Sequence, residues 1–140
     1  MVKIPNWLIY ALVCSLLYGF WGVFSKLATK YIDYKTAFVY EAIGTLIATA
    51  FILTSSKNFS LEGNIAGIVF ALLVGVCGTV ASLIFLRAME SGPVVSVISI
   101  TSLYPLITIL LSYLFLKEPI TIPQIIALVL ALLAVILSSY

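Results

Sequence analysis

Five long apolar runs, separated by short polar segments, account for most of the chain. They cover residues 7–27, 36–54, 64–89, 94–116 and 122–138. Each has about the 20 residues that a helix needs to cross a bilayer, and none alternates apolar and polar positions as a barrel strand would. The pattern predicts an all-α integral membrane protein with five transmembrane helices in a single domain, residues 1–140.

The segments between the runs hold residues that end and start helices. "ESGP" places Gly92 after the third run and Pro93 at the start of the fourth. In "KEPITIPQ", Thr121 and Gln124 have capping-box spacing and Pro123 falls in the first turn, which predicts the start of the fifth helix. The first run is too long for a signal peptide, so we interpret it as a span of the mature protein.

Composition excludes several classes of function. Hydrophobic residues make up 64% of the chain and charged residues 9%, whereas a soluble domain has about 25% charged residues. The net charge is only +2 and histidine is absent, so we expect no nucleic-acid partner and no histidine-based metal site. Cys14 and Cys77 lie in apolar runs without CxxC spacing and are interpreted as small apolar residues. We expect no cofactor and no enzyme activity, because no nucleophile, base and orienting group can be assembled.

Basic residues give almost no preference for one orientation in the membrane. One side of a five-span chain would hold three of them and the other side four: Lys3, Lys57 and Lys117 against Lys26, Lys30, Lys35 and Arg87. Either one orientation wins weakly, or the chain inserts both ways and two copies pair antiparallel, as the halves of an inverted-repeat transporter do.

The fourth run carries a polar stripe around a proline. Thr101, Tyr104, Thr108 and Ser112 share one helical face with Pro105, which cannot donate the helical bond to the Thr101 carbonyl. Two interpretations stay open. The hydroxyls bond to carbonyls of their own helix and the proline serves packing, or the stripe lines a cavity at mid-depth that holds a polar solute.

The first run has a comparable face. Ser15, Gly19, Gly22 and Lys26 recur every three or four residues, and Tyr18, Trp21 and Ser25 flank them. The glycines are expected to allow close helix packing. Lys26 either extends to the membrane interface or offers its charge to a solute.

Glu41 lies about a turn and a half into the second run, where a carboxylate needs a partner or a proton. An ion pair with Lys26 would satisfy it. Alternatively, Glu41 reaches the headgroups, or it faces the cavity and is the candidate for proton coupling, because desolvation favours the neutral acid.

The third and fifth runs are interpreted as packing surfaces. In the third, Gly67, Ala71, Gly75 and Thr79 recur every four residues with Gly78 and Ser82 nearby, which predicts a small-residue face against a neighbouring helix. The fifth has no polar side chain in "IIALVLALLAVIL" and is assigned to lipid or to a partner subunit.

Two segments resemble a known family. They are "YGFWGVFSKLATK" in the first run and "LRAMESGPVVSVISITSLYPLITILLSYLFLKEPITIPQIIALVLALLAVIL" over the last three. Together with the five-span length, they are similar to one EamA-type domain of the drug/metabolite transporter superfamily. The family's "WG" and lysine fall on Trp21, Gly22 and Lys26, its proline on Pro105, and its loop glutamate on Glu118.

The resemblance implies half of a ten-helix inverted-repeat transporter that needs a second copy. It implies alternating access of a small-molecule solute through a central cavity. Many relatives carry a basic residue about where Glu41 stands, so substrate charge and ion coupling cannot be transferred. The small multidrug exporters of the superfamily have four spans and a first-span glutamate that is missing here.

We therefore expect a homodimeric, multi-pass transporter of small metabolites in the cell membrane, in contact with lipid and driven by protons. Its cavity is predicted to be lined by Ser15, Tyr18, Trp21, Gly22, Lys26, Glu41, Thr101, Tyr104, Pro105 and Thr108. The alternatives are a non-transporting membrane subunit or regulator and a lipid-moving protein.

Overall fold

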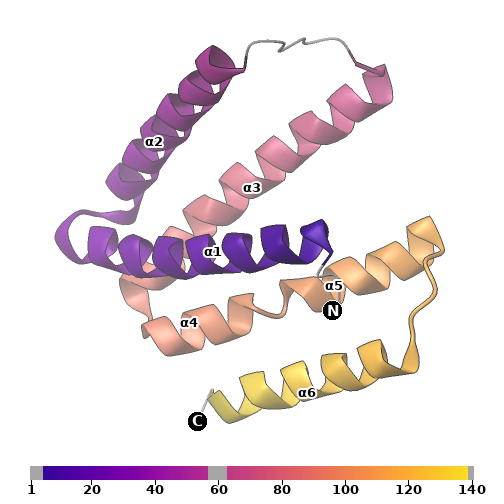
Figure 1. Ribbon diagram of the computed structural model, residues 1–140. Helices are drawn as coiled ribbons and strands as arrows, with labels where there is room; N and C mark the ends of the chain where they lie inside the picture. Colours follow the sequence, from indigo (N-terminus) through magenta and orange to yellow (C-terminus); the bar gives the residue numbers. More distant parts are fainter. Residues whose placement is uncertain (1–4, 57–62, 139–140) are drawn as a thin grey trace. The chain divides into compact units, whose positions relative to one another are not determined.

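The computed structural model describes residues 5–56 and 63–138, and all of its regular elements are helices (Figure 1). The predicted positions of Lys3 and Lys57 lie outside the described residues. The chain divides into two compact units, residues 1–91 and residues 92–140, which are described in turn.

The first unit consists of three long helices. They are α1 (Asn6–Tyr31), α2 (Tyr34–Ser55) and α3 (Ile65–Ser91). Each is long and apolar enough to cross a membrane, with a mean hydropathy of 1.8, 1.7 and 2.6 respectively. At 1.5 Å per residue, α1 is about 39 Å long, so its ends emerge from a hydrocarbon layer of about 30 Å.

The turn between α1 and α2 is set by local hydrogen bonds. The Ile32 amide donates to the Ala28 carbonyl and closes α1. Asp33 then caps α2, because its carboxylate accepts from the amides of Lys35 and Thr36. The backbone is therefore extended at only two residues between the helices, Ile32 and Asp33.

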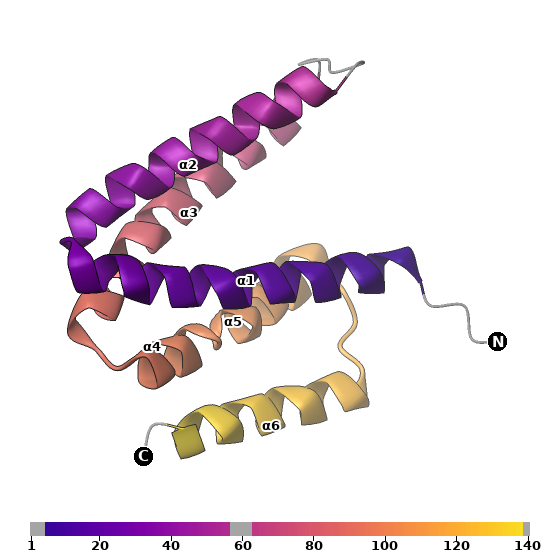
Figure 2. The ribbon, with the colours of Figure 1, turned by 60° about the vertical axis from the view of Figure 1, so that its left-hand side comes forward.

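The three helices pack most tightly at one end. α1 and α2 both pack against α3, and α2 and α3 lie side by side in two views (Figures 1 and 2). The buried apolar side chains of Ala37, Phe85, Leu86 and Met89 gather where α1 ends, α2 begins and α3 ends. We call this end, residues 22–37 and 82–91, the junction.

The second unit begins with an interrupted helix. α4 (Val94–Thr101), α5 (Tyr104–Leu111) and the π-helix η1 (Ser112–Leu116) follow one another over the 23-residue apolar stretch from 94 to 116. The stretch has the predicted length of one span, and its helix is interrupted near Pro105. The chain makes a tight turn at Ser102 and Leu103, where the Leu103 amide donates to the Ile100 carbonyl.

The break has a physical cause in Pro105. A proline ring clashes with the preceding turn of a helix, but the ring is tolerated in a first turn, whose amides have no helical partner. Pro105 is the second residue of α5, so the chain starts a new helix there instead of bending an old one. η1 ends at Lys117, which has a left-handed backbone with φ of 55°.

The last helix, α6 (Ile122–Ser138), begins as predicted and packs against α4. The Gln124 side chain accepts from both the amide and the hydroxyl of Thr121, so the predicted cap is confirmed. With 17 residues, α6 is at the lower limit for a membrane span. Residues 5–56 and 63–138 therefore contain four candidate spans and one shorter apolar helix, an arrangement of five apolar segments in agreement with the sequence.

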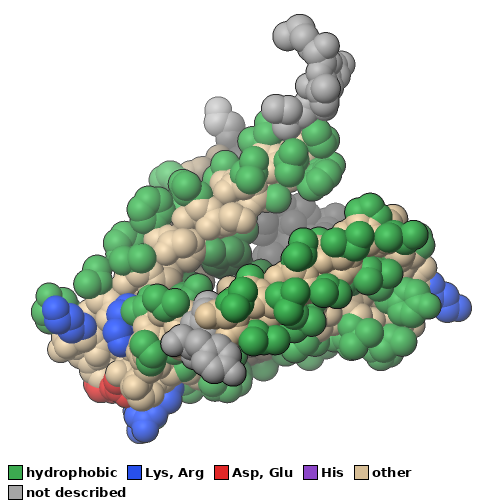
Figure 3. Space-filling view, turned by 90° about the horizontal axis from the view of Figure 1, so that it is seen from below, with side chains coloured by type: hydrophobic (Ala, Val, Ile, Leu, Met, Phe, Trp, Pro, Cys, Tyr) green, Lys and Arg blue, Asp and Glu red, His purple; other side chains and the backbone are tan. Residues whose placement is uncertain are grey.

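Apolar side chains dominate the outer surface. Trp7 and Phe115, for example, are 67% and 79% exposed, and Figure 3 shows hydrophobic side chains covering the helices, with Lys and Arg confined to the extremities. Soluble monomers rarely expose apolar patches of this extent, and the long apolar helices are of the kind that contact lipid.

Candidate functional site

A carboxylate is held between the three helices of the first unit. Glu41 of α2 accepts hydrogen bonds from Trp21 Nε1 of α1 at 3.2 Å and from Ser82 Oγ of α3, which lies 2.7 Å from Oε1 and 2.8 Å from Oε2. All three side chains are half-buried. We call these residues, together with Phe85, the Glu41 cluster.

The cluster lies inside the membrane-spanning length of the helices. Glu41 is seven residues from the start of α2 and Ser82 is nine residues from the end of α3, which is about 10 to 14 Å along each axis. Phe85 stacks on the Trp21 indole with ring centroids 4.5 Å apart, and Tyr18 meets the same indole edge-on at 6.4 Å. Aromatic packing thus fixes the indole N–H toward the carboxylate.

Lys26 is not paired with Glu41. Its ammonium donates to the main-chain carbonyl of Met89 at 2.6 Å, while Glu41 has Trp21 and Ser82 as donors. Met89 is two residues from the end of α3, where carbonyls have no helical partner, so the lysine caps α3. Of the alternatives given for Glu41, the ion pair with Lys26 is not the arrangement seen, because both groups bond to α3 instead.

The other predicted residues of α1 take different positions. Gly22 is buried in the junction, next in helical spacing to the buried Ser25, whose hydroxyl bonds to the Trp21 carbonyl at 2.8 Å. Ser15 and Tyr18 are exposed. The structure therefore brings Tyr18, Trp21 and Glu41 together and leaves Ser15 outside this group.

The predicted residues of the second unit make hydrogen bonds within their own segments. Thr101 donates to the Val97 and Ile98 carbonyls, and Thr108 donates to the Tyr104 carbonyl. These bonds agree with the interpretation that the hydroxyls bond to carbonyls of their own helix. Thr101, Tyr104, Pro105 and Thr108 are all exposed, and their lining of a solute cavity stays a prediction.

Sequence reasoning missed the role of Ser82. It was assigned to the small-residue packing face of the third run, but it bonds to Glu41. The rest of that face is open within the described part of the chain. A β-carbon added at Gly67, Gly75 or Gly78 would meet no neighbouring side chain or helix within 4 Å.

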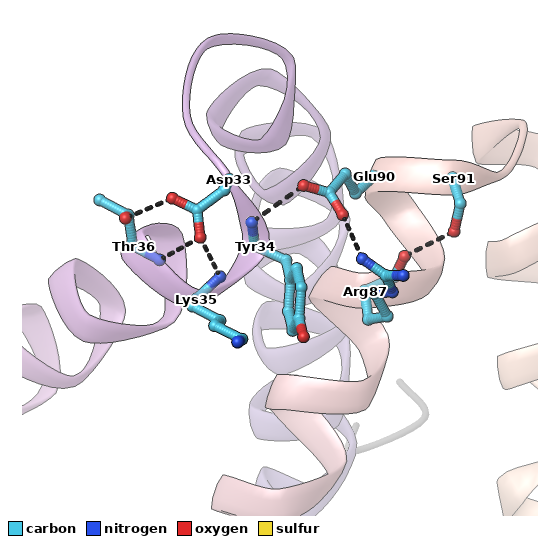
Figure 4. A network of polar contacts seen from close by, with 7 residues as sticks. All are labelled: Asp33, Tyr34, Lys35, Thr36, Arg87, Glu90 and Ser91. Atoms are coloured by element: carbon cyan, nitrogen blue, oxygen red, sulfur yellow. Dashed lines mark hydrogen bonds and ion pairs between the residues drawn. The ribbon is translucent and has the colours of Figure 1, made fainter.

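The junction also holds a polar network at its outer edge (Figure 4). Glu90 accepts from the Tyr34 amide at 3.2 Å and pairs with Arg87 at 3.0 Å, so it ties the start of α2 to the end of α3. The Arg87 guanidinium lies 4.7 Å from the centre of the Tyr34 ring. Neither Glu90 nor Tyr34 was singled out by its pattern in the sequence.

In this network, Asp33 is a group whose pKa is clearly lowered. The Thr36 hydroxyl, and then the amides of Thr36 and Lys35, bond to its carboxylate and hold its pKa below the ordinary value of 3.8. No group of three or more potential metal ligands occurs among residues 5–56 and 63–138.

Apolar helices of spanning length, a lipid-facing surface and a carboxylate held between helices define a multi-pass helical membrane protein. The chain belongs to the EamA-like transporter family, which it matches over residues 5–140. This agrees with the resemblance seen in the sequence and with the expectation of a transporter in place of an enzyme.

A relative of nearly the same length supports this membership. The chain is 30% identical over 132 residues to an uncharacterized protein of Methanocaldococcus jannaschii. The alignment covers 94% of this chain and 95% of the relative. No solved structure matches the chain.

Proposed function

We propose that the chain moves small metabolites across the cell membrane by alternating access, as a homodimer of two antiparallel copies, and that Glu41 takes up and releases a proton in each cycle. The observation that carries the proposal is the position of the Glu41 carboxylate between Trp21 and Ser82, inside the span of a chain from a transporter family.

The partners of Glu41 suit both of its protonation states. An indole N–H only donates, so Oε1 accepts from Trp21 whether or not the acid is ionised. A serine hydroxyl donates or accepts, so Ser82 donates to the carboxylate and accepts from Oε2–H of the neutral acid. The donors that Glu41 meets, Trp21 and Ser82, are uncharged, whereas Lys26 donates to the Met89 carbonyl. A proton can therefore be added or removed without separating the helices.

The charges in the spans favour a solute with a positive group. Lys26, Arg87 and Glu90 lie near the junction end of the first unit, and residues 94–116 and 122–138 carry no charged side chain. Glu41 is thus the deep fixed charge, and a cationic solute would compete with a proton for it. The Tyr18 and Trp21 rings beside it offer the aromatic surface on which organic cations bind.

The homodimer follows from length and charge. The relative from Methanocaldococcus jannaschii also has the length of one such five-helix unit, since the alignment covers 95% of it. The resemblance calls for two units related by inversion, and the near balance of basic residues removes the barrier to opposite orientations.

Proteoliposomes with a trapped pH dye test the proposal. Choline, leucine and lactate serve as cationic, zwitterionic and anionic probes, and each is added outside vesicles that contain the purified chain. We expect choline to release protons from acidified vesicles and the other two to release fewer. Glu41→Gln should lower this release at least tenfold while it keeps a bond to Ser82. Thr49→Ala is the matched control, since Thr49 bonds only to the Thr45 carbonyl on the same helix.

Each part of the proposal has an outcome that opposes it. Equal proton release by wild type and Glu41→Gln would exclude Glu41 as the proton site. No flux with any probe would favour the non-transporting subunit. Flux of labelled phospholipid would favour the lipid-moving alternative. Crosslinking that traps only parallel pairs or monomers would exclude the antiparallel homodimer.

A further inference from the structure

The described outer edge of the junction carries three cations, Lys30, Lys35 and Arg87, against the two carboxylates of Asp33 and Glu90. Lys30 is in the last turn of α1, Lys35 is in the first turn of α2, and Arg87 is four residues from the end of α3. All three are exposed. The helices that carry them are longer than the hydrocarbon layer, so these side chains reach the level of the lipid headgroups.

The acids of the same edge are already occupied. Asp33 accepts from the amides of Lys35 and Thr36 and from the Thr36 hydroxyl, so it serves as the cap of α2. Glu90 is shared between Arg87 and the Tyr34 amide. Among the described residues, Lys30 and Lys35 have no carboxylate within ion-pair distance. The edge therefore presents excess positive charge.

Each of these three cations lies close to a tyrosine ring. Lys30 lies 5.6 Å from the centre of the Tyr31 ring, and Lys35 lies 5.8 Å from the centre of the Tyr34 ring. Arg87 approaches the same Tyr34 ring at 4.7 Å, and in Figure 4 that ring lies between the two side chains. Two like charges that share one ring repel each other, and an anion bound beside them removes this repulsion.

We propose that Lys30, Lys35 and Arg87 form a binding site for the phosphate headgroup of an anionic phospholipid, with Tyr31 and Tyr34 at the interface beside it. The membrane surface is the occupant because the cations stand at helix ends of a lipid-facing unit, where headgroup phosphates are the abundant anions. The proposal specifies the headgroup that binds, and it holds for either side of the membrane. It does not depend on transport.

Lipid retention measures the site directly. The full chain is reconstituted in nanodiscs of equal parts phosphatidylglycerol and phosphatidylcholine and then released for native mass spectrometry. We expect phosphatidylglycerol to be retained in preference. Each lysine near an anionic surface contributes about a factor of five, so Lys30→Gln with Lys35→Gln should lower the preference by about thirtyfold.

Three further arms make the result specific. Lys117→Gln removes an exposed cation of the second unit and should leave the preference unchanged. Lys30→Arg with Lys35→Arg keeps both charges and should retain it. Inorganic phosphate at 10 mM should displace no lipid. The proposal fails if wild type shows no preference, if Lys117→Gln lowers it as much as the double glutamine variant, or if free phosphate displaces the lipid.

Discussion

The Glu41 cluster and the hydroxyl stripe of the second unit contain similar residue types but make different contacts. Ser82 donates across to another helix, whereas Thr101 and Thr108 donate to carbonyls of their own segments. Thr79, three residues before Ser82 on α3, also donates within its helix, to the Gly75 carbonyl. A hydroxyl in these helices therefore bonds between helices only where a carboxylate lies opposite, because a charged acceptor is stronger than a helical carbonyl.

Burial differs between the same two regions. The buried apolar side chains of the described residues all belong to the first unit, whereas α4 and α5 have none. The first unit is thus held by contacts between helices, and its polar cluster is built on that core. The stability of the second unit therefore depends on hydrogen bonds within its segments and on contacts with the surrounding membrane.

The largest expected effect comes from removing the core of the first unit. Leu86→Ala, at a side chain with 2% exposure, should lower the free energy of unfolding by about 2 to 4 kcal/mol because it leaves a cavity in the junction. The matched control is Leu130→Ala on α6, where the side chain is 60% exposed and should cost far less. Unfolding by denaturant titration in bicelles measures both, and equal losses would contradict the contrast between the units.

A smaller effect is expected from the interhelical hydroxyl. Ser82→Ala removes a donor from both oxygens of Glu41 and should lower the free energy of unfolding by about 1 to 2 kcal/mol. Thr79→Ala on the same helix and Thr108→Ala in the second unit remove only local bonds and should stay within about 0.5 kcal/mol of wild type. The same denaturant titration measures these variants. If Thr108→Ala lowered the free energy of unfolding as much as Ser82→Ala, the contrast between the Glu41 cluster and the hydroxyls of the second unit would be contradicted.

The smallest effect concerns the pH dependence of the junction. The pKa of Asp33 is held below 3.8 by the Thr36 hydroxyl and neighbouring amides, so its contribution is complete above pH 3.8 and is lost as the pH falls through the lower folded value. Asp33→Asn should make protection at the start of α2 independent of pH in this window. Hydrogen exchange of residues 34–38 between pH 5 and pH 2 measures it, and an unchanged acid dependence in Asp33→Asn would assign the loss to another group.

The sequence predicts the helices well because their length and polarity are set by the bilayer. The described ends of α3 and α6 lie within two residues of the predicted ones, and the Thr121–Gln124 cap is present. A disruption at Pro105 was expected, but its position at Ser102 and Leu103, upstream of the proline, was not. A proline restricts the residue before it, and this rule indicates a helix boundary upstream of Pro105.

The site was predicted only in part because its partners come from different helices. Trp21 and Glu41 were each singled out, and they are bonded to each other. The pairing of Ser82 with Glu41 depends on the rotation of α3, which small-residue spacing does not fix. The acceptor of Lys26 is a main-chain oxygen, and such an acceptor has no residue type that a pattern could reveal.

That main-chain acceptor has a consequence for evolution. Any amino acid at position 89 supplies the same carbonyl, so the bond to Lys26 constrains the main chain there, whereas burial constrains the Met89 side chain. An apolar substitution of Met89 would therefore leave this link between α1 and α3 in place.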